Sequence, residues 1–439
     1  MTTPIFDFVK AYAERKTARF HMPGHKGVGK LGCEKYDITE IFGADVLYSA
    51  EGIIAESENN LSALYGTAHS FYSTEGSTLG IKAMLHLVSA RSGDERPLIL
   101  AGRNAHAAFI RAAALLDLDV EWIYPGKQEH LCECHITSQD IDRAVESIVK
   151  RPCAVYVTSP DYLGNMLNIR DLALCCRRHG IPLIVDNAHG AYLKFLPEDL
   201  HPITLGAAMC VDSAHKTLPV LTGGAYLHIS KDFGEFVPRA RGALSLFAST
   251  SPSYLTLASL DLCNKILADD YSQRLSALVK KSAEIKGKIA SMGFDVCDSE
   301  PLKITVRSGA DLAEHLRGQG IEVEFSDLEY TVLMLTPENT DVDLDRLLPC
   351  FSAFRGEKSN IKNLVPKPHC AEMTIRKAVL SQNELVSVEN AVGRICASPT
   401  VSCPPAVPIV ISGERITLED IELFKHYGIE KVSVVIEHK

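Results

Sequence analysis

Residues 211–224 read Val-Asp-Ser-Ala-His-Lys-Thr-Leu-Pro-Val-Leu-Thr-Gly-Gly, and residues 183–190 read Leu-Ile-Val-Asp-Asn-Ala-His-Gly. Each stretch begins as an apolar run that predicts a buried strand, and each continues into side chains that can do chemistry. The first carries Lys216 and the second carries Asp186. Because ligands of open α/β sheets bind beyond the carboxyl ends of the strands, we expect both side chains at one ligand site.

A lysine and an aspartate in these positions are typical of a pyridoxal 5′-phosphate (PLP) site. A lysine amine forms a Schiff base with the cofactor aldehyde, which is the role we expect for Lys216. Asp186 is expected to pair with the pyridine nitrogen and keep it protonated, so that the ring accepts electrons. Ala188 follows on the same side of an extended chain, and its small side chain suits the flat face of the ring. The alternative is an ordinary strand-end aspartate and a surface lysine.

The segment Gly76-Ser77-Thr78 opens an apolar helical pattern and is the candidate phosphate grip. Backbone N–H groups and hydroxyls at a helix N-terminus suit a dianion. A simple helix cap explains the same residues without a ligand.

The stretch 213–222 resembles the cofactor-lysine motif of the Orn/Lys/Arg decarboxylases, a family of aspartate-aminotransferase-like (fold type I) PLP enzymes. Seven further segments continue the resemblance in the family's order. They are FHMPGHKG (20–27), DITEI (37–41), EGIIAE (51–56), EGSTLG (75–80), RNAH (103–106), TSPSY (250–254) and AVGRI (391–395). Family members with an additional N-terminal regulatory domain are much longer, so the chain resembles the short form.

The resemblance implies an activity and several residue roles. The family converts arginine, lysine or ornithine into the corresponding amine and CO2, in polyamine metabolism. By resemblance, His106 stacks on the cofactor ring, Ser213 contacts the phosphate, and His215 lies on the substrate carboxylate side. Thr250 and Ser251 match a segment that reaches the phosphate of the neighbouring subunit, which implies a homodimer or a higher homo-oligomer.

Four departures from the family pattern bear on the choice of substrate. They are Ala107 where the family commonly has lysine, Asp161 in place of threonine, Asn187 in place of glutamate, and Cys403-Pro-Pro-Ala406-Val-Pro in place of Tyr-Pro-Pro-Gly-Ile-Pro. None of them removes Lys216 or Asp186. A basic substrate needs an acceptor for its distal cation. The candidates are Asp45, Glu51 and Asp161, and none is favoured.

Composition narrows the class of protein. The 439 residues carry a net charge of −10, which argues against a nucleic-acid partner because no basic stripe is available for phosphates. No apolar run approaches the length of a membrane span, and the N-terminus lacks the features of a signal peptide. The 13 cysteines are interpreted as reduced thiols of a cytoplasmic protein. Residues 130–135, His-Leu-Cys-Glu-Cys-His, resemble a metal cluster but lack a second knuckle, so we expect a solvated loop and no metal.

Short apolar runs alternate with helical periodicity, which predicts a mostly parallel α/β sheet. The predicted strands are 97–101, 120–123, 154–158, 183–186, 209–211 and 224–228, and the predicted helices are 6–19 and 254–292. We expect an N-terminal arm (1–45), a PLP-binding large domain (46–262), a bridging helix with a small α+β domain (263–356), and a C-terminal module (357–439).

The leading hypothesis is therefore a PLP-dependent decarboxylase of a basic amino acid. Two alternatives remain open at this point. One is another fold type I reaction, either transamination or elimination, on a different amino acid. The other is a non-catalytic binding protein that keeps the fold.

Overall fold

The computed structural model describes residues 1–126, 128–356, 364–398 and 406–437. They form two compact units, each built from two separate lengths of chain. The first unit contains residues 1–91 and 182–276, and the second contains residues 92–181 and 277–439. The predicted mixed α/β class with mostly parallel large-domain strands is confirmed.

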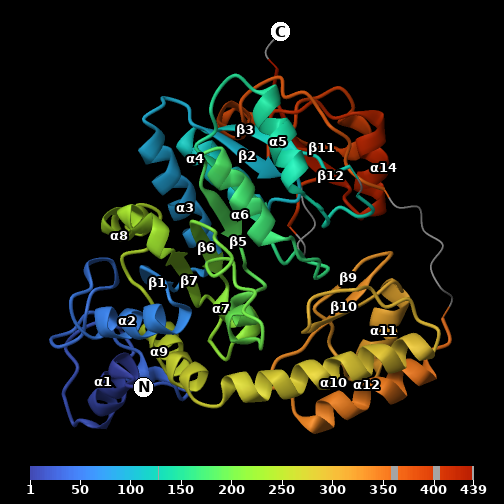
Figure 1. Ribbon diagram of the computed structural model, residues 1–439. Helices are drawn as coiled ribbons and strands as arrows, with labels where there is room; N and C mark the ends of the chain where they lie inside the picture. The colour runs from blue at the N-terminus through green and yellow to red at the C-terminus, as the bar shows by residue number, and fades with distance from the viewer. Residues whose placement is uncertain (127, 357–363, 399–405, 438–439) are drawn as a thin grey trace. The chain divides into compact units, whose positions relative to one another are not determined.

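The first unit carries four strands in the order β1-β7-β6-β5 (Figure 1). β5 and β6 are parallel, whereas β7 is antiparallel to both β6 and β1. The strands are β1 His69–Ser73, β5 Leu183–Asp186, β6 Met209–Asp212 and β7 Ala225–Ile229. The helices are α1 Pro4–Glu14, α2 Ile53–Tyr65, α3 Gly76–Ser92, α7 Ala214–Thr217, α8 Val237–Ser245 and α9 Tyr254–Ala268, with short 3-10 helices η1 Glu34–Tyr36, η2 Leu47–Ser49, η3 Ala191–Phe195 and η4 Lys231–Phe236. Helix α10 Tyr271–Ser291 begins in this unit, but most of its residues belong to the second.

Helices α1, α2 and α9 pack against one another around a buried acid, Asp261 of α9. Its Oδ2 accepts the backbone N–H groups of Ile5 and Phe6 at 2.9 and 3.0 Å, in the first turn of α1. Its Oδ1 accepts the hydroxyl of Ser57 in α2. Burial raises the pKa of Asp261 to about 6. One side chain thus joins three helices.

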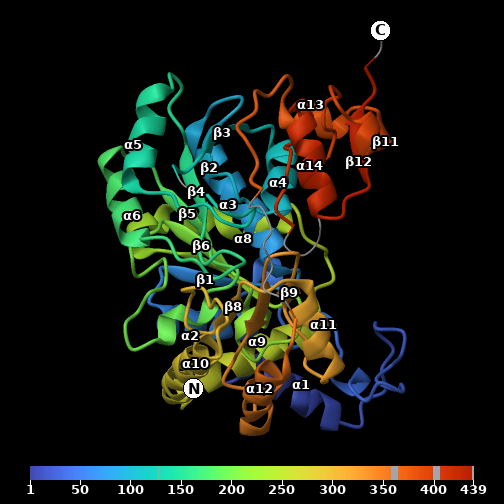
Figure 2. The same cartoon turned by 90° about the vertical axis from the view of Figure 1, so that its right-hand side faces the viewer.

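The second unit contains the parallel strands β4, β2 and β3, a three-stranded sheet of β8, β10 and β9, and a two-stranded sheet of β11 and β12, with helices packed against them (Figure 2). The parallel strands run in the order β4-β2-β3, so β3 lies at an edge. The strands are β2 Leu98–Gly102, β3 Asp119–Ile123, β4 Ala154–Thr158, β8 Lys303–Val306, β9 Phe325–Ser326, β10 Thr331–Met334, β11 Asn383–Ser387 and β12 Lys431–Val435. The helices are α4 Ala107–Leu116, α5 Ser138–Ser147, α6 Ile169–Arg178, α11 Ala310–Gly318, α12 Asp341–Ala353, α13 Ile375–Leu380 and α14 Leu418–His426, with η5 Val388–Asn390.

Local chemistry explains where these elements begin. Thr137 and Asp140 form a reciprocal capping box at the start of α5, and Thr417 and Asp420 do the same for α14. β4 and β5 are short apolar runs that are almost wholly buried, as expected for strands covered on both faces. Among the helices of the described residues, none is both long enough and apolar enough to span a bilayer.

Two predicted helices need correction. The helix predicted over 6–19 begins at Pro4 and ends at Glu14, because the backbone of Arg15 is extended. The single helix predicted over 254–292 is two helices, α9 and α10. Asp269 leaves the helical region with ψ −104°, and aspartate is a poor helix former.

Candidate cofactor site

The structure brings the two deciding stretches together in the first unit. Lys216 lies in α7, the single helical turn that follows β6, and His189 lies in the turn that follows β5. The Nζ atom of Lys216 is 3.0 Å from Nε2 of His189. His189 was part of the quoted motif, but only the folded chain shows its contact with the lysine. The two strand ends therefore present one shared set of side chains.

Asp186 ends β5 and is almost completely buried, with 3% of its surface exposed. Its Oδ1 accepts the backbone N–H of Ala188 at 3.2 Å, which bends the chain into the turn that carries His189. The backbone N–H of Asn187 donates to the carbonyl of Val211 in β6 at 2.9 Å. The turn is thereby fixed to the strand that leads to Lys216.

The candidate phosphate grip lies at the start of α3. Ser77 of this helix accepts a hydrogen bond from the hydroxyl of Ser213 at 2.8 Å, so two predicted phosphate ligands are neighbours. Gly76 has φ +70°, and a Cβ atom there would meet no atom within 4 Å, which leaves space in front of the helix. Thr78 is half-buried in the same first turn. Free N–H groups at the start of a helix and these hydroxyls suit an anion.

Three further predicted site residues belong to the same unit. His215 is partly buried, and its Nδ1 donates to the carbonyl of Gly224 at 2.9 Å. Burial lowers the pKa of His215, so the imidazole is neutral at pH 7. Thr250 and Ser251 are exposed, in the turn where the backbone N–H of Ser249 donates to Glu75 at 2.8 Å.

His106 belongs to the second unit. It caps α4, and its Nδ1 accepts the backbone N–H of Ala108 at 3.1 Å. The next residue, Ala107, donates its N–H to the carbonyl of Ala406 at 2.8 Å. Two of the departures from the family pattern are therefore in contact. Ala406 has φ +57°, a conformation that the family's glycine adopts without strain.

Arg103, the first residue of the RNAH motif, is 99% buried and attaches this loop to the C-terminal module. Its guanidinium donates to the carbonyls of Pro408 and Ile409 at 2.8 and 2.6 Å. Cys403 and the two prolines that follow it, part of the fourth departure, lie outside the described residues. The described part of the segment, from Ala406 onward, is held by Arg103.

A fully buried network behind the site was missed by the sequence analysis. Asp212, the last residue of β6, accepts Nε2 of both His201 and His228, at 3.1 and 3.2 Å, and the side-chain amide of Asn187 at 2.7 Å. Burial raises the pKa of Asp212, but the two imidazoles lower it more, so the group stays ionised. The hydroxyl of Ser70 completes the network by donating to His228 at 2.7 Å. No sequence motif links these positions, which come from separate strands and loops.

Two candidates for the distal cation acceptor have structural roles instead. Asp45 caps α2 by accepting the N–H groups of Gly52 and Ile54 at 2.8 and 3.0 Å. Asp161 is buried and accepts the N–H groups of Leu163 and Asn165, both at 2.9 Å, which closes its own turn. Both carboxylates are saturated by their own loops and are poorly placed to receive a substrate.

The prediction of a solvated loop at residues 130–135 is wrong. His130, Cys132 and Cys134 are all at most 4% exposed. His130 pairs with Asp327 at 2.7 Å, and Cys134 donates to the carbonyl of Ile123 at 3.7 Å. The partner of His130 is 197 residues away in the sequence, so composition alone does not reveal that the loop is part of the core.

Comparison with known proteins identifies the family. The Orn/Lys/Arg decarboxylase major domain matches residues 3–307, and the C-terminal domain of the same family matches residues 358–428. An arginine decarboxylase of Bacillus subtilis is 29% identical over 97% of this chain and 93% of its own length. The uncharacterized protein YaaO of the same organism is also 29% identical, over 96% of this chain and 93% of its own. Among solved structures, the lysine decarboxylase LdcF of Francisella novicida superposes with a TM-score of 0.81 at 16% identity, over 99% of this chain and 81% of its own.

The site also fits the cofactor of this family. The amine of Lys216, the buried carboxylate of Asp186 and the open anion site in front of α3 match the aldehyde, the ring nitrogen and the phosphate of PLP in number and in charge. The chain therefore belongs to the Orn/Lys/Arg decarboxylase family and is a PLP-dependent decarboxylase of a basic amino acid.

Proposed function

We propose that the chain decarboxylates arginine to its amine and CO2, with Lys216 as the residue that attaches the cofactor. The contact between Lys216 and His189, beside the joined hydroxyls of Ser77 and Ser213, is the observation that carries the proposal. Four relatives named arginine decarboxylase match nearly the whole chain at 27–29% identity. The relative named constitutive lysine decarboxylase is 20% identical and is matched over 76% of its length.

Each residue has a proposed part in the reaction. When bound, PLP accepts the electron pair of the bond between Cα and the carboxylate. Asp186 holds the proton on the ring nitrogen, and Ser77, Thr78 and Ser213 hold the phosphate. Gly76 leaves space for the phosphate, while its own N–H donates to the carbonyl of Gly223 at 2.7 Å. Ala188 and His106 are proposed to contact the two faces of the ring.

Proton transfer and the loss of CO2 fall to Lys216 and His215. Nζ of Lys216 delivers the proton that Cα needs after CO2 has left. His215 is neutral, so it orients the substrate carboxylate without adding an opposite charge that would stabilise it against departure. His189 accepts a hydrogen bond from the lysine and fixes its position.

We also propose the setting of this activity. Thr250 and Ser251 are exposed, which supports their contributing to the phosphate site of a second subunit in a homodimer. The division into an arm (1–45), a large domain (46–262), a small domain (263–356) and a C-terminal module (357–439) remains a proposal. So do a cytoplasmic location and a role in polyamine synthesis.

The test uses purified protein saturated with PLP and offers arginine, lysine and ornithine separately, with CO2 and amine quantified. Arginine is expected to give equal amounts of CO2 and amine at the highest rate. Lys216→Ala should lower that rate by at least roughly 10²- to 10⁴-fold, the range for loss of a proton-transfer group. Lys265→Ala, at an exposed lysine of α9, is the matched control and should keep the rate.

Different products would contradict the proposal in distinct ways. A keto acid in place of CO2 would mean transamination. CO2 released faster from lysine or ornithine would replace arginine as the substrate and leave the decarboxylase assignment intact.

A further inference from the structure

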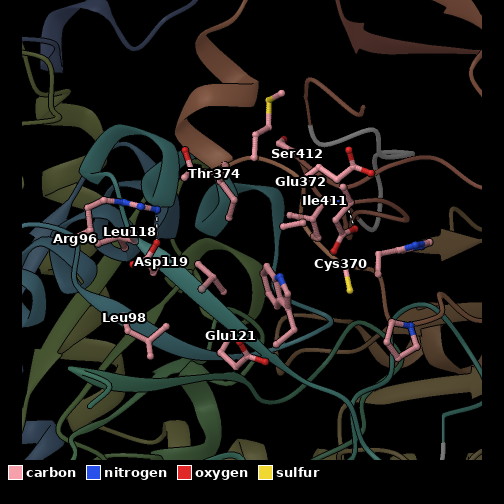
Figure 3. A pocket seen from close by; sticks show the side chains of 18 of the residues that line it. Arg96, Leu98, Leu118, Asp119, Glu121, Cys370, Glu372, Thr374, Ile411 and Ser412 are labelled. Atoms are coloured by element: carbon pink, nitrogen blue, oxygen red, sulfur yellow. Dashed lines mark hydrogen bonds and ion pairs between the residues drawn. The ribbon is translucent and has the colours of Figure 1, made fainter. Parts of the chain in front are cut away.

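A second cavity lies in the second unit, lined by residues other than those of the cofactor site. It has a volume of about 810 Å³, within the range of about 300–1,000 Å³ that small-molecule pockets occupy. Its walls are the edge strand β3, residues 368–375 and residues 411–414 (Figure 3). None of the residues that line this cavity has a part in the proposed reaction.

The inner wall holds a buried hydroxyl that lacks a partner. Ser412 is 1% exposed, and its Oγ forms no hydrogen bond with any residue that the structure describes. A buried polar group without a partner is unfavourable, and a hydrogen-bonding ligand in the cavity would satisfy this hydroxyl. Glu414 lies beside it, 2% exposed, with Oε2 accepting the N–H of Ile411 at 2.7 Å. Burial raises the pKa of Glu414, and a bound cation would lower it again.

The two cationic side chains that line the cavity already have anionic partners, and the guanidinium of Arg103, 5.8 Å from the Trp122 ring, donates to backbone carbonyls. Arg96 pairs with Asp119, and Nε2 of His369 is 3.1 Å from Asp420. By contrast, Glu121 at the rim is exposed and has no hydrogen bond or ion pair with the described residues (Figure 3). Nε of Arg96 also lacks a hydrogen bond within the described part of the chain, whereas the Oγ of Ser412 and the carboxylate of Glu121 are oxygen atoms that can accept hydrogen bonds from a cation.

The remaining feature of the lining is Trp122, the one tryptophan of the chain. An indole ring contributes apolar surface and attracts cations to its face. We propose that this cavity binds a small linear alkyl diamine, with one ammonium group at Ser412 and Glu414, the carbon chain along Trp122, and the second ammonium group near Glu121. Decarboxylation of lysine or ornithine yields an alkyl diamine, whereas arginine yields an aminoalkyl guanidine, so the proposal rests on the proposed function in the class of reaction alone.

Trp122 makes the test specific to the cavity, because all tryptophan fluorescence comes from its wall. The PLP-loaded protein is titrated with cadaverine, and tryptophan emission is followed without any turnover. We expect a saturable change that pentanediol, the neutral analogue, does not produce. Glu121→Gln and Ser412→Ala should each raise the dissociation constant about tenfold, equivalent to about 1.4 kcal/mol. Glu314→Gln on α11 is the matched control, with the same change of charge outside the cavity.

Three results would overturn the proposal. They are an unchanged emission up to roughly 10 mM cadaverine, an equal response to pentanediol, and a response that neither variant weakens. Cofactor absorbance is recorded in parallel, so that an emission change that only follows the cofactor site is recognised as the third result. None of these readings depends on whether arginine is decarboxylated, so failure here leaves the proposed function standing.

Discussion

Asp212 and Asp261 are both fully buried acids of the first unit, yet their pKa values are shifted in opposite directions. The pKa of Asp212 lies well below its ordinary value, because two imidazoles outweigh the effect of burial. The pKa of Asp261 is raised to about 6, because burial outweighs its hydrogen bonds. The depth of burial alone therefore does not decide whether the pKa of a buried acid rises or falls.

The difference lies in the partners. The Nε2 atoms of His201 and His228 both lie against the carboxylate of Asp212, and this interaction lowers its pKa. Asp261 is held by a hydroxyl and two backbone N–H groups, which offer dipoles alone. The pKa of a buried carboxylate falls where its neighbours stabilise the charged form by more than burial destabilises it, and rises where they do not. Asp212, whose pKa is lowered, directly precedes Ser213 in the cofactor loop. Asp261, whose pKa is raised, joins three helices.

The largest expected effect comes from removing the charge of Asp212. Asp212→Asn leaves two buried imidazoles without an anionic acceptor, and we expect the free energy of unfolding to fall by about 3–5 kcal/mol. Urea unfolding monitored by circular dichroism measures the change. Asp269→Asn, at an exposed position that ends α9, should change it by less than about 0.5 kcal/mol. A loss below about 1 kcal/mol for Asp212→Asn would show that the network is not coupled to the charge.

The next largest change in the free energy of unfolding is expected when an acid is added to the same network at position 187. Asn187→Glu, which restores the family's residue, places a second carboxylate against Asp212 and should cost about 3 kcal/mol. The double variant Asn187→Glu with Asp212→Asn again has one acid and one amide. It should be at least about 2 kcal/mol more stable than the sum of the single effects. Simple additivity in the double-mutant cycle would refute this account of the departure at 187.

The smallest effect concerns Asp261 and depends on pH. Its folded pKa of about 6 is above the ordinary value of 3.8, so the folded state binds the extra proton between these values and loses stability as pH rises through that window. Asp261→Asn cannot titrate. Its stability relative to the parent should therefore improve by up to about 2 kcal/mol between pH 4 and pH 7.

Thermal unfolding at matched pH values checks this last prediction. Asp269→Asn again serves as the control and should follow the parent at each pH. A stability difference for Asp261→Asn that stays constant across the range would mean that Asp261 is ionised in the folded protein throughout.

Much of the fold was predictable where burial is continuous along the sequence. Strands 154–158 and 183–186 were predicted with the bounds that β4 and β5 have, because their apolar runs are unbroken. β1, with the sequence His-Ser-Phe-Tyr-Ser, was missed because its polar residues find partners far away, such as Ser70 with His228. Buried polar strands have no local signature.

The candidate site shows the same limit. Lys216, Asp186 and Ser213 follow strand ends and could be found from the sequence, and their assignment to the cofactor stays a prediction. The role of His189 and the network around Asp212 required distances between chain segments. The loop 130–135 was misjudged because His130 meets Asp327, nearly 200 residues away.

The hydrogen bonds of Arg103 bear on whether the two family regions of this chain can be separated, in experiments or in evolution. The two family regions, 3–307 and 358–428, look like separable pieces, yet the guanidinium of the first is satisfied by carbonyls of the second. A fragment ending near residue 307 would lose these acceptors of the Arg103 guanidinium, and such a fragment should be less stable than the whole chain. Natural recombination faces the same restriction, so the two regions are expected to descend together.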